Sequence, residues 1–75
     1  MTPLLARLVA LVVAEAELPA IAVDAETPIY RYGLDSRALM RIVEAAEAEF
    51  SLLADLDRVS PAETIAALAE AFAPA

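Results

Sequence analysis

The chain has 75 residues, 61% of them hydrophobic, and a formal net charge of −7. It contains no histidine, cysteine or lysine, so a nucleophilic serine would have no partner base, and neither a thiol nucleophile, a Schiff base nor a soft-ligand zinc site is available. The acidity disfavours binding to nucleic acids and anionic membranes, and it favours transient docking to basic protein surfaces. The length predicts one domain, residues 1–75, and the absence of cysteine suits a cytoplasmic protein.

The first helix is predicted over residues 3–17. Thr2 is a good N-cap and Pro3 is suited to the first helical position. Apolar residues then recur at helical spacing until Pro19, which ends the pattern. The run "LVALVVA" resembles a short signal-peptide core, but the apolar stretch begins at Leu4 and contains Arg7, so no positive residue precedes it. The run is also too short to span a bilayer. We therefore interpret it as a core helix.

Residues 18–34 show no clean period and contain Pro19, Pro28 and the single glycine, Gly33. Loops of this length are uncommon unless they are functional. Because this one is rich in apolar residues, we expect an ordered loop that lies over the core. At least one of Tyr30 and Tyr32 should anchor it, with the hydroxyl towards solvent.

A second amphipathic helix is predicted over residues 36–50, with Asp35 as its N-cap. Its apolar stripe consists of Leu39, Ile42, Val43, Ala46 and Phe50. Its other face carries Arg37, Arg41, Glu44, Glu47 and Glu49. Arg41 either pairs with Glu44 at i, i+3 or contributes to the choice of partner proteins.

The last third predicts a short element and a final helix. Leu53, Leu56 and Val59 have the spacing of about one and a half helical turns. The sequence Ser60-Pro61-Ala62-Glu63 is a capping box that predicts a helix over residues 61–73. No alternating strand pattern is present. We therefore expect an all-α bundle of four helices, three longer and one short, with a long loop after the first helix.

The segment Gly-Leu-Asp-Ser, residues 33–36, allows three interpretations: a plain helix start, a catalytic serine or an attachment point. A catalytic serine lacks a base. Ser36 would lie at the exposed first turn of the helix, where the helix dipole favours a negative charge. Gly33 would allow a tight turn before it. The position suits a phosphoester added by another enzyme, and the plain helix start also stays open.

The stretch "TPIYRYGLDSRALMRIVEAAEAEF", residues 27–50, resembles the acyl and peptidyl carrier proteins. The lengths and order of the other elements also match, so the resemblance covers essentially the whole chain. It implies that Ser36 receives 4′-phosphopantetheine from coenzyme A by a separate phosphopantetheinyl transferase, and that cargo is carried as thioesters on its thiol. It also implies that Gly33, Leu34 and Asp35 shape the site, and that the chain is a carrier without catalytic activity of its own.

The resemblance further implies that the helix after the serine is the docking surface. The candidate residues are Arg37, Met40, Arg41, Glu44, Glu47 and Ala48. Position 37 is usually apolar in the family, and Arg37 and Arg41 interrupt the acidic row typical of fatty-acid carriers. This departure favours a carrier of polyketide or nonribosomal peptide biosynthesis over a fatty-acid carrier.

The expected partners are the transferase and, by transient docking, acyltransferase, adenylation or ligase, and ketosynthase-type enzymes. We expect a monomer that is either free-standing or a domain of a larger synthase, and the sequence favours the free-standing form. The alternative from a different class is an unmodified helical interaction module.

Overall fold

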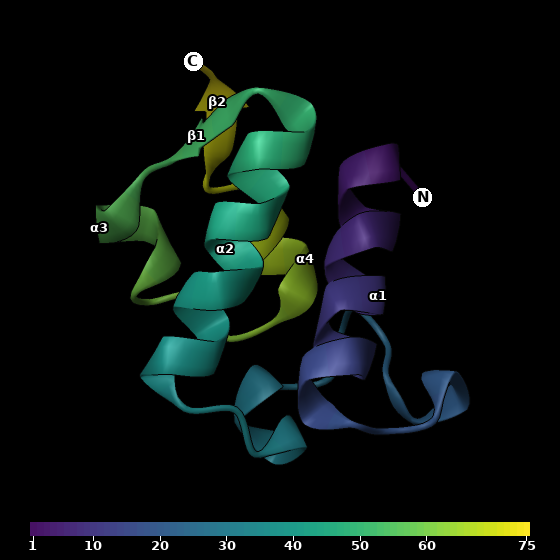
Figure 1. The fold of residues 1–75 in the computed structure, drawn as a ribbon. Coiled ribbons are helices and arrows are strands. Elements are labelled where there is room, and N and C mark those ends of the chain that lie inside the picture. Colours follow the sequence, from purple (N-terminus) through teal and green to yellow (C-terminus); the bar gives the residue numbers. More distant parts are fainter.

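The structure is a computed structural model that describes all 75 residues. Its helices are α1 (Pro3–Ala16), α2 (Ser36–Phe50), α3 (Leu56–Val59) and α4 (Ile65–Ala69), and its strands are β1 (Leu52–Ala54) and β2 (Phe72–Pro74). α1 and α2 run antiparallel side by side, and the long loop between them crosses one end of the molecule (Figure 1). The predicted four-helix fold with a long loop after the first helix is confirmed, although the helices divide into two long and two short ones.

The two long helices begin at the predicted N-caps. The Thr2 hydroxyl accepts a hydrogen bond from the Leu5 amide at 3.1 Å, and the Asp35 carboxylate accepts one from the Ala38 amide at 2.8 Å. α1 stops at Ala16, one residue before the predicted end, because Glu17 adopts a left-handed conformation with φ 54°. Local capping therefore sets the ends of both helices.

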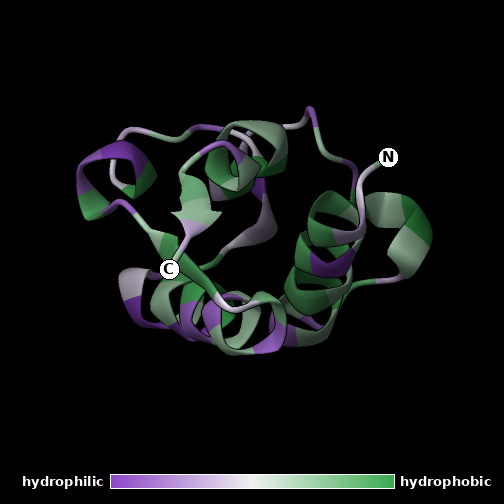
Figure 2. Ribbon diagram, turned by 90° about the horizontal axis from the view of Figure 1, so that it is seen from above, coloured by the Kyte–Doolittle hydropathy of each residue, from purple (hydrophilic) through white to green (hydrophobic).

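The core lies between α1, α2 and α4, and no polar side chain is buried in it. Its fully buried larger side chains are Leu8, Val12, Ile42, Val43, Ile65 and Leu68. α1 is mostly hydrophobic, whereas hydrophobic and hydrophilic residues alternate around the turns of α2 (Figure 2). α2 is therefore the long helix with a substantial polar outer face, and this face borders the candidate site described below.

The predicted final helix is present, but its predicted bounds, residues 61–73, are wrong, because α4 covers only Ile65–Ala69. Ser60 ends α3, and Thr64 is the residue whose hydroxyl caps α4, 3.0 Å from the Ala67 amide. Residues before Thr64 are held by the long loop, since Ile29 donates a backbone hydrogen bond to the Glu63 carbonyl at 2.8 Å and Pro28 pairs with Thr64. This tertiary pairing takes up backbone groups that the predicted helix would use.

The two strands were not predicted. They pair antiparallel, with Leu53 opposite Ala73. The Asp55 amide extends the pairing with a 2.8 Å bond to the Ala71 carbonyl, and the Glu47 carboxylate accepts a 2.9 Å bond from the Ala54 amide. Glu47, proposed from the sequence for docking, thus holds β1 against the end of α2.

Tyr32 anchors the long loop, as predicted for one of the two tyrosines, but its hydroxyl does not face solvent. The residue is only 8% exposed, and the hydroxyl accepts from the Asp24 amide and donates to the Asp24 carbonyl, both at 3.1 Å. Tyr30, in contrast, is 75% exposed. The Tyr32 hydroxyl therefore closes the loop on itself across eight residues.

Replacing Tyr32 by phenylalanine should lower the free energy of unfolding by about 0.5–1.5 kcal/mol, because the ring stays packed while two hydrogen bonds to the Asp24 backbone are lost. Urea unfolding of Tyr32→Phe and of the matched variant Tyr30→Phe measures the difference. Tyr30→Phe should unfold like the wild type. Equal stability of all three proteins would contradict the anchoring role.

Candidate functional site

Ser36 is the first residue of α2, and it is exposed. The loop reaches it through Gly33, whose φ of 71° ends the 3₁₀ turn formed by Ile29–Tyr32. A Cβ atom at position 33 would meet no atom within 4 Å beyond its neighbours in the chain, so the glycine is favoured by its backbone conformation and not by lack of space. The tight turn places the Ser36 hydroxyl at the surface where the loop meets α2.

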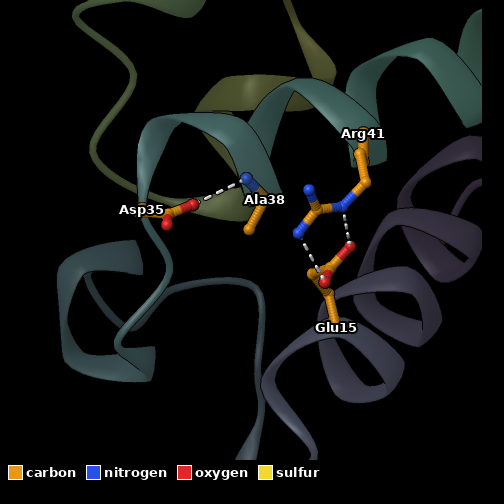
Figure 3. A network of polar contacts seen from close by, with 4 residues as sticks. All are labelled: Glu15, Asp35, Ala38 and Arg41. Atoms are coloured by element: carbon orange, nitrogen blue, oxygen red, sulfur yellow. Dashed lines mark hydrogen bonds and ion pairs between the residues drawn. The ribbon is translucent and has the colours of Figure 1, made fainter.

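Asp35 fixes the start of the helix beside Ser36. One carboxylate oxygen accepts a hydrogen bond from the Ala38 amide at 2.8 Å (Figure 3). The Asp35 carbonyl accepts another from the Leu39 amide at 3.0 Å. The second carboxylate oxygen makes no hydrogen bond. Asp35 is exposed, so this oxygen is accessible to another protein next to the Ser36 hydroxyl.

An apolar groove of about 440 Å³ borders Ser36. It lies between the end of the loop, the first half of α2, and α3. Its lining residues are Ile29, Leu34, Asp35, Ser36, Leu39, Met40, Leu56, Val59 and Ser60. The side chain of Leu34 is part of this wall, which supports a site-shaping role for that residue. The groove offers an apolar surface to any flexible group attached to Ser36.

A second, shallower hollow lies on the outer face of α2 and is lined by Ser36, Arg37, Met40, Arg41 and Glu44. Ser36 and Met40 therefore border both the apolar groove and this charged hollow. Four of the six residues proposed from the sequence for docking are brought together here. Of the other two, Glu47 is engaged with β1, and Ala48 is exposed but lies outside this hollow.

Arg41 does not pair with Glu44, so the i, i+3 ion pair, one of the two alternatives for this residue, is absent. Its Nε and Nη2 atoms bind the two carboxylate oxygens of Glu15 on α1, at 3.0 and 3.1 Å (Figure 3). This bidentate ion pair suits the planar guanidinium better than a pair with Glu44 on the same helix. It also lowers the pKa of Glu15 below its usual value.

A second clamp of the same type joins the opposite ends of these helices. Arg7 binds Glu49 with Nε and Nη2, both at 2.8 Å. The hydrogen bond from Arg7 lowers the pKa of the Glu49 carboxyl. The two ion pairs connect α1 to α2, so the helix that begins at Ser36 is fixed to the rest of the bundle near both of its ends.

The chain has no histidine or lysine, and no three acidic residues cluster in a way that would hold a metal ion. None of the helices is long and apolar enough to cross a membrane. The arrangement is that of a small helical acceptor domain: an exposed serine hydroxyl at a helix start, an adjacent carboxylate, and an apolar groove next to them.

A family model described as a phosphopantetheine attachment site matches residues 6–72. The chain therefore belongs to this family of carrier domains, whose members bear a 4′-phosphopantetheine prosthetic group. Comparisons with curated proteins and with solved structures gave no significant match.

Sequence reasoning did not find the wall of the groove that α3 provides. Leu56 and Val59 belong to the predicted short element and Ser60 to the predicted capping box, but none of the three was expected to line the site. The spacing of Leu56 and Val59 was the available signal, because it places both side chains on one face of a helical turn. The spacing does not predict the direction in which this face points. That direction depends on the pairing of β1 with β2.

Proposed function

We propose that Ser36 carries the prosthetic group and that the chain shuttles acyl or peptidyl intermediates as thioesters between enzymes. The position of Ser36 carries this proposal, because the chain has two other serines that fit it less well. Ser51 ends α2 in a left-handed conformation with φ 54°, and Ser60 ends the four-residue α3. Only Ser36 opens a long helix, where a phosphoester is favoured by the helix dipole.

In the loading reaction the Ser36 Oγ forms a bond to a phosphorus of the coenzyme A pyrophosphate while the bond to the bridging oxygen breaks. The adenosine 3′,5′-bisphosphate half leaves, and the serine proton passes to a base of the transferase, with the carboxylate of the adjacent Asp35 placed to assist. The bound group supplies a terminal thiol, which the chain itself lacks. Exposure of Ser36 and the neighbouring apolar groove suit the chain to accept and bear this arm.

The absence of cysteine makes the test clean. After incubation with a permissive phosphopantetheinyl transferase and coenzyme A, and removal of small molecules, any protein thiol must come from the attached arm. A thiol-specific reagent should find one thiol per chain, and none without the transferase. No thiol with any of several transferases would contradict the proposed function.

For partner docking, we propose the outer face of α2 near Ser36, with Arg37, Met40 and Glu44 as its most available residues. Arg41 also lines this face but shares its charge with Glu15. Met40 is half-buried between the two hollows and offers an adaptable apolar contact.

The two arginines within an otherwise acidic surface support a carrier of specialised biosynthesis, polyketide or nonribosomal peptide, over a fatty-acid carrier. The partners would be acyltransferase, adenylation or ligase, and ketosynthase-type enzymes, and we propose a cytoplasmic monomer.

Charge changes at Arg41 should separate docking from stability. Arg41→Glu places two carboxylates together and should lower the melting temperature. The double variant Arg41→Glu, Glu15→Arg restores the pair, and with it the melting temperature, while the reversed charge stays on α2. Loading by the transferase should change about 1.5- to 5-fold in the double variant, as expected for one exposed charge. Wild-type loading rates in this variant would contradict a docking role for position 41.

A further inference from the structure

Arg37 stands out among the five arginines of the chain. Arg7 and Arg41 are bound to carboxylates on a neighbouring helix. Arg37 is exposed and makes neither an ion pair nor a side-chain hydrogen bond, and the same holds for Arg31 and Arg58. Of these three, only Arg37 borders a hollow together with Ser36, whereas Arg58 lines a separate hollow beside Asp57 and Glu70.

The proposed modification changes the charge next to Arg37. A phosphodiester on the Ser36 oxygen carries one negative charge, and it would stand one residue after the Asp35 carboxylate. Two neighbouring anions repel each other, and a cation that lies beside both of them offsets this repulsion. A guanidinium is suited to this role, because its parallel N–H groups match two phosphate oxygens and it stays charged at any physiological pH.

The second arginine of the hollow is not available for this purpose. Both the Nε and the Nη2 of Arg41 are bound to Glu15, and the carboxylate turns the guanidinium towards α1 (Figure 3). Of the two arginines that line the hollow, Arg41 is therefore paired with a carboxylate and Arg37 is not. The remaining charged residue, Glu44, repels a phosphate.

We propose that the Arg37 guanidinium pairs with the phosphodiester on Ser36, so that loading removes the free positive charge from the docking face of α2. The proposal rests on attachment at Ser36. Before loading, this face presents Arg37 and Glu44 about two helical turns apart, with opposite charges. After loading, Glu44 remains the only charged group on it without a partner. The transferase and the enzymes that use the loaded carrier thus meet different charge patterns on one helix.

Nuclear magnetic resonance of the arginine Nε–H groups tests the pairing directly, in the full chain before and after loading. The Arg37 resonance should shift and its hydrogen exchange with water should slow in the loaded protein, while the Arg58 and Arg31 resonances stay in place. The Arg37 shift should shrink in 1 M salt, because the pair is exposed. An Arg37 resonance that does not respond to loading would overturn the proposal.

Thermal melting gives a second measurement on matched variants. Arg37→Gln and Arg58→Gln remove the same charge, but only the first removes the proposed partner of the phosphate. We define the loading shift as the melting temperature of the loaded protein minus that of the unloaded protein. This shift should be about 1–5 °C lower in Arg37→Gln than in the wild type. Arg58→Gln should match the wild type. Equal differences in all three proteins would contradict the pairing.

The two proposals fail in distinguishable ways. If no thiol appears after incubation with the transferase, attachment at Ser36 is wrong and the pairing falls with it. If the thiol appears in the wild type but not in Ser36→Ala, and Arg37 is indifferent to loading in both measurements, the pairing alone is wrong.

Discussion

Ser36→Ala is expected to abolish attachment of the prosthetic group completely and to leave the fold in place. The reacting oxygen is removed, and neither of the other two serines opens a long helix. The side chain is exposed and makes no hydrogen bond in the structure, so its loss should change the melting temperature by at most a few degrees, in line with surface substitutions of within about 0.5 kcal/mol. The thiol count after incubation with the transferase measures the effect.

Ser60→Ala is the matched control for this prediction. Ser60 lines the same apolar groove as Ser36 and is also exposed. This variant should still acquire one thiol per chain. Loss of the thiol in both variants would point to damage of the groove and not to removal of the acceptor. Retention of the thiol in Ser36→Ala would contradict attachment at that residue.

Leu68→Ala should cause the largest loss of stability of the changes considered. Leu68 is fully buried, and it is one of two side chains by which the five-residue α4 is fixed in the core. Leucine-to-alanine changes in cores cost about 2–5 kcal/mol. A domain of this size has a total free energy of unfolding of about 4–11 kcal/mol. The substitution therefore removes a large share of the stability.

Leu53→Ala provides the comparison, because Leu53 is 59% exposed on β1 and the chemical change is identical. Urea unfolding followed by circular dichroism should show a clear fall in midpoint for Leu68→Ala and little change for Leu53→Ala. Similar midpoints for the two variants would mean that α4 contributes little to the core.

The first two thirds of the fold could be predicted because the signals there are local. Thr2 and Asp35 cap the long helices through side-chain oxygens three residues before the amides they bind. Each helix then buries a stripe that repeats over three or more turns. Such a stripe can be read from spacing alone, and both helices were predicted to within one residue.

The last third could not be predicted, because its structure depends on residues far away in the sequence. Ser60 to Glu63 has the pattern of a capping box, but the Glu63 carbonyl is bound to the Ile29 amide and Thr64 becomes the cap. In the same way, Phe72 pairs with Ala54 and does not continue a helix. These long-range hydrogen bonds replace the local bonds that a longer helix would form. A short sequence pattern contains no information about such tertiary contacts.

The candidate site shows the same contrast between local features, which could be predicted, and long-range contacts, which could not. Gly33, Leu34, Asp35 and Ser36 lie together in the structure, as expected from four adjacent residues at a helix start. The partners of Arg41 and Glu47 were not foreseen, because they lie on α1 and β1. Sequence spacing identified which side chains lie on α2, but only the packed structure shows which of them are already engaged.

The exposed Ser36 at the start of α2 is the proposed attachment residue of the prosthetic group. The most direct test is fragmentation mass spectrometry of the wild-type chain after loading, which assigns the added mass to a residue. The account predicts one phosphopantetheine per chain, on the fragment that contains Ser36, with Ser51 and Ser60 unmodified. A modification found on either of those serines, or none at all, would contradict it.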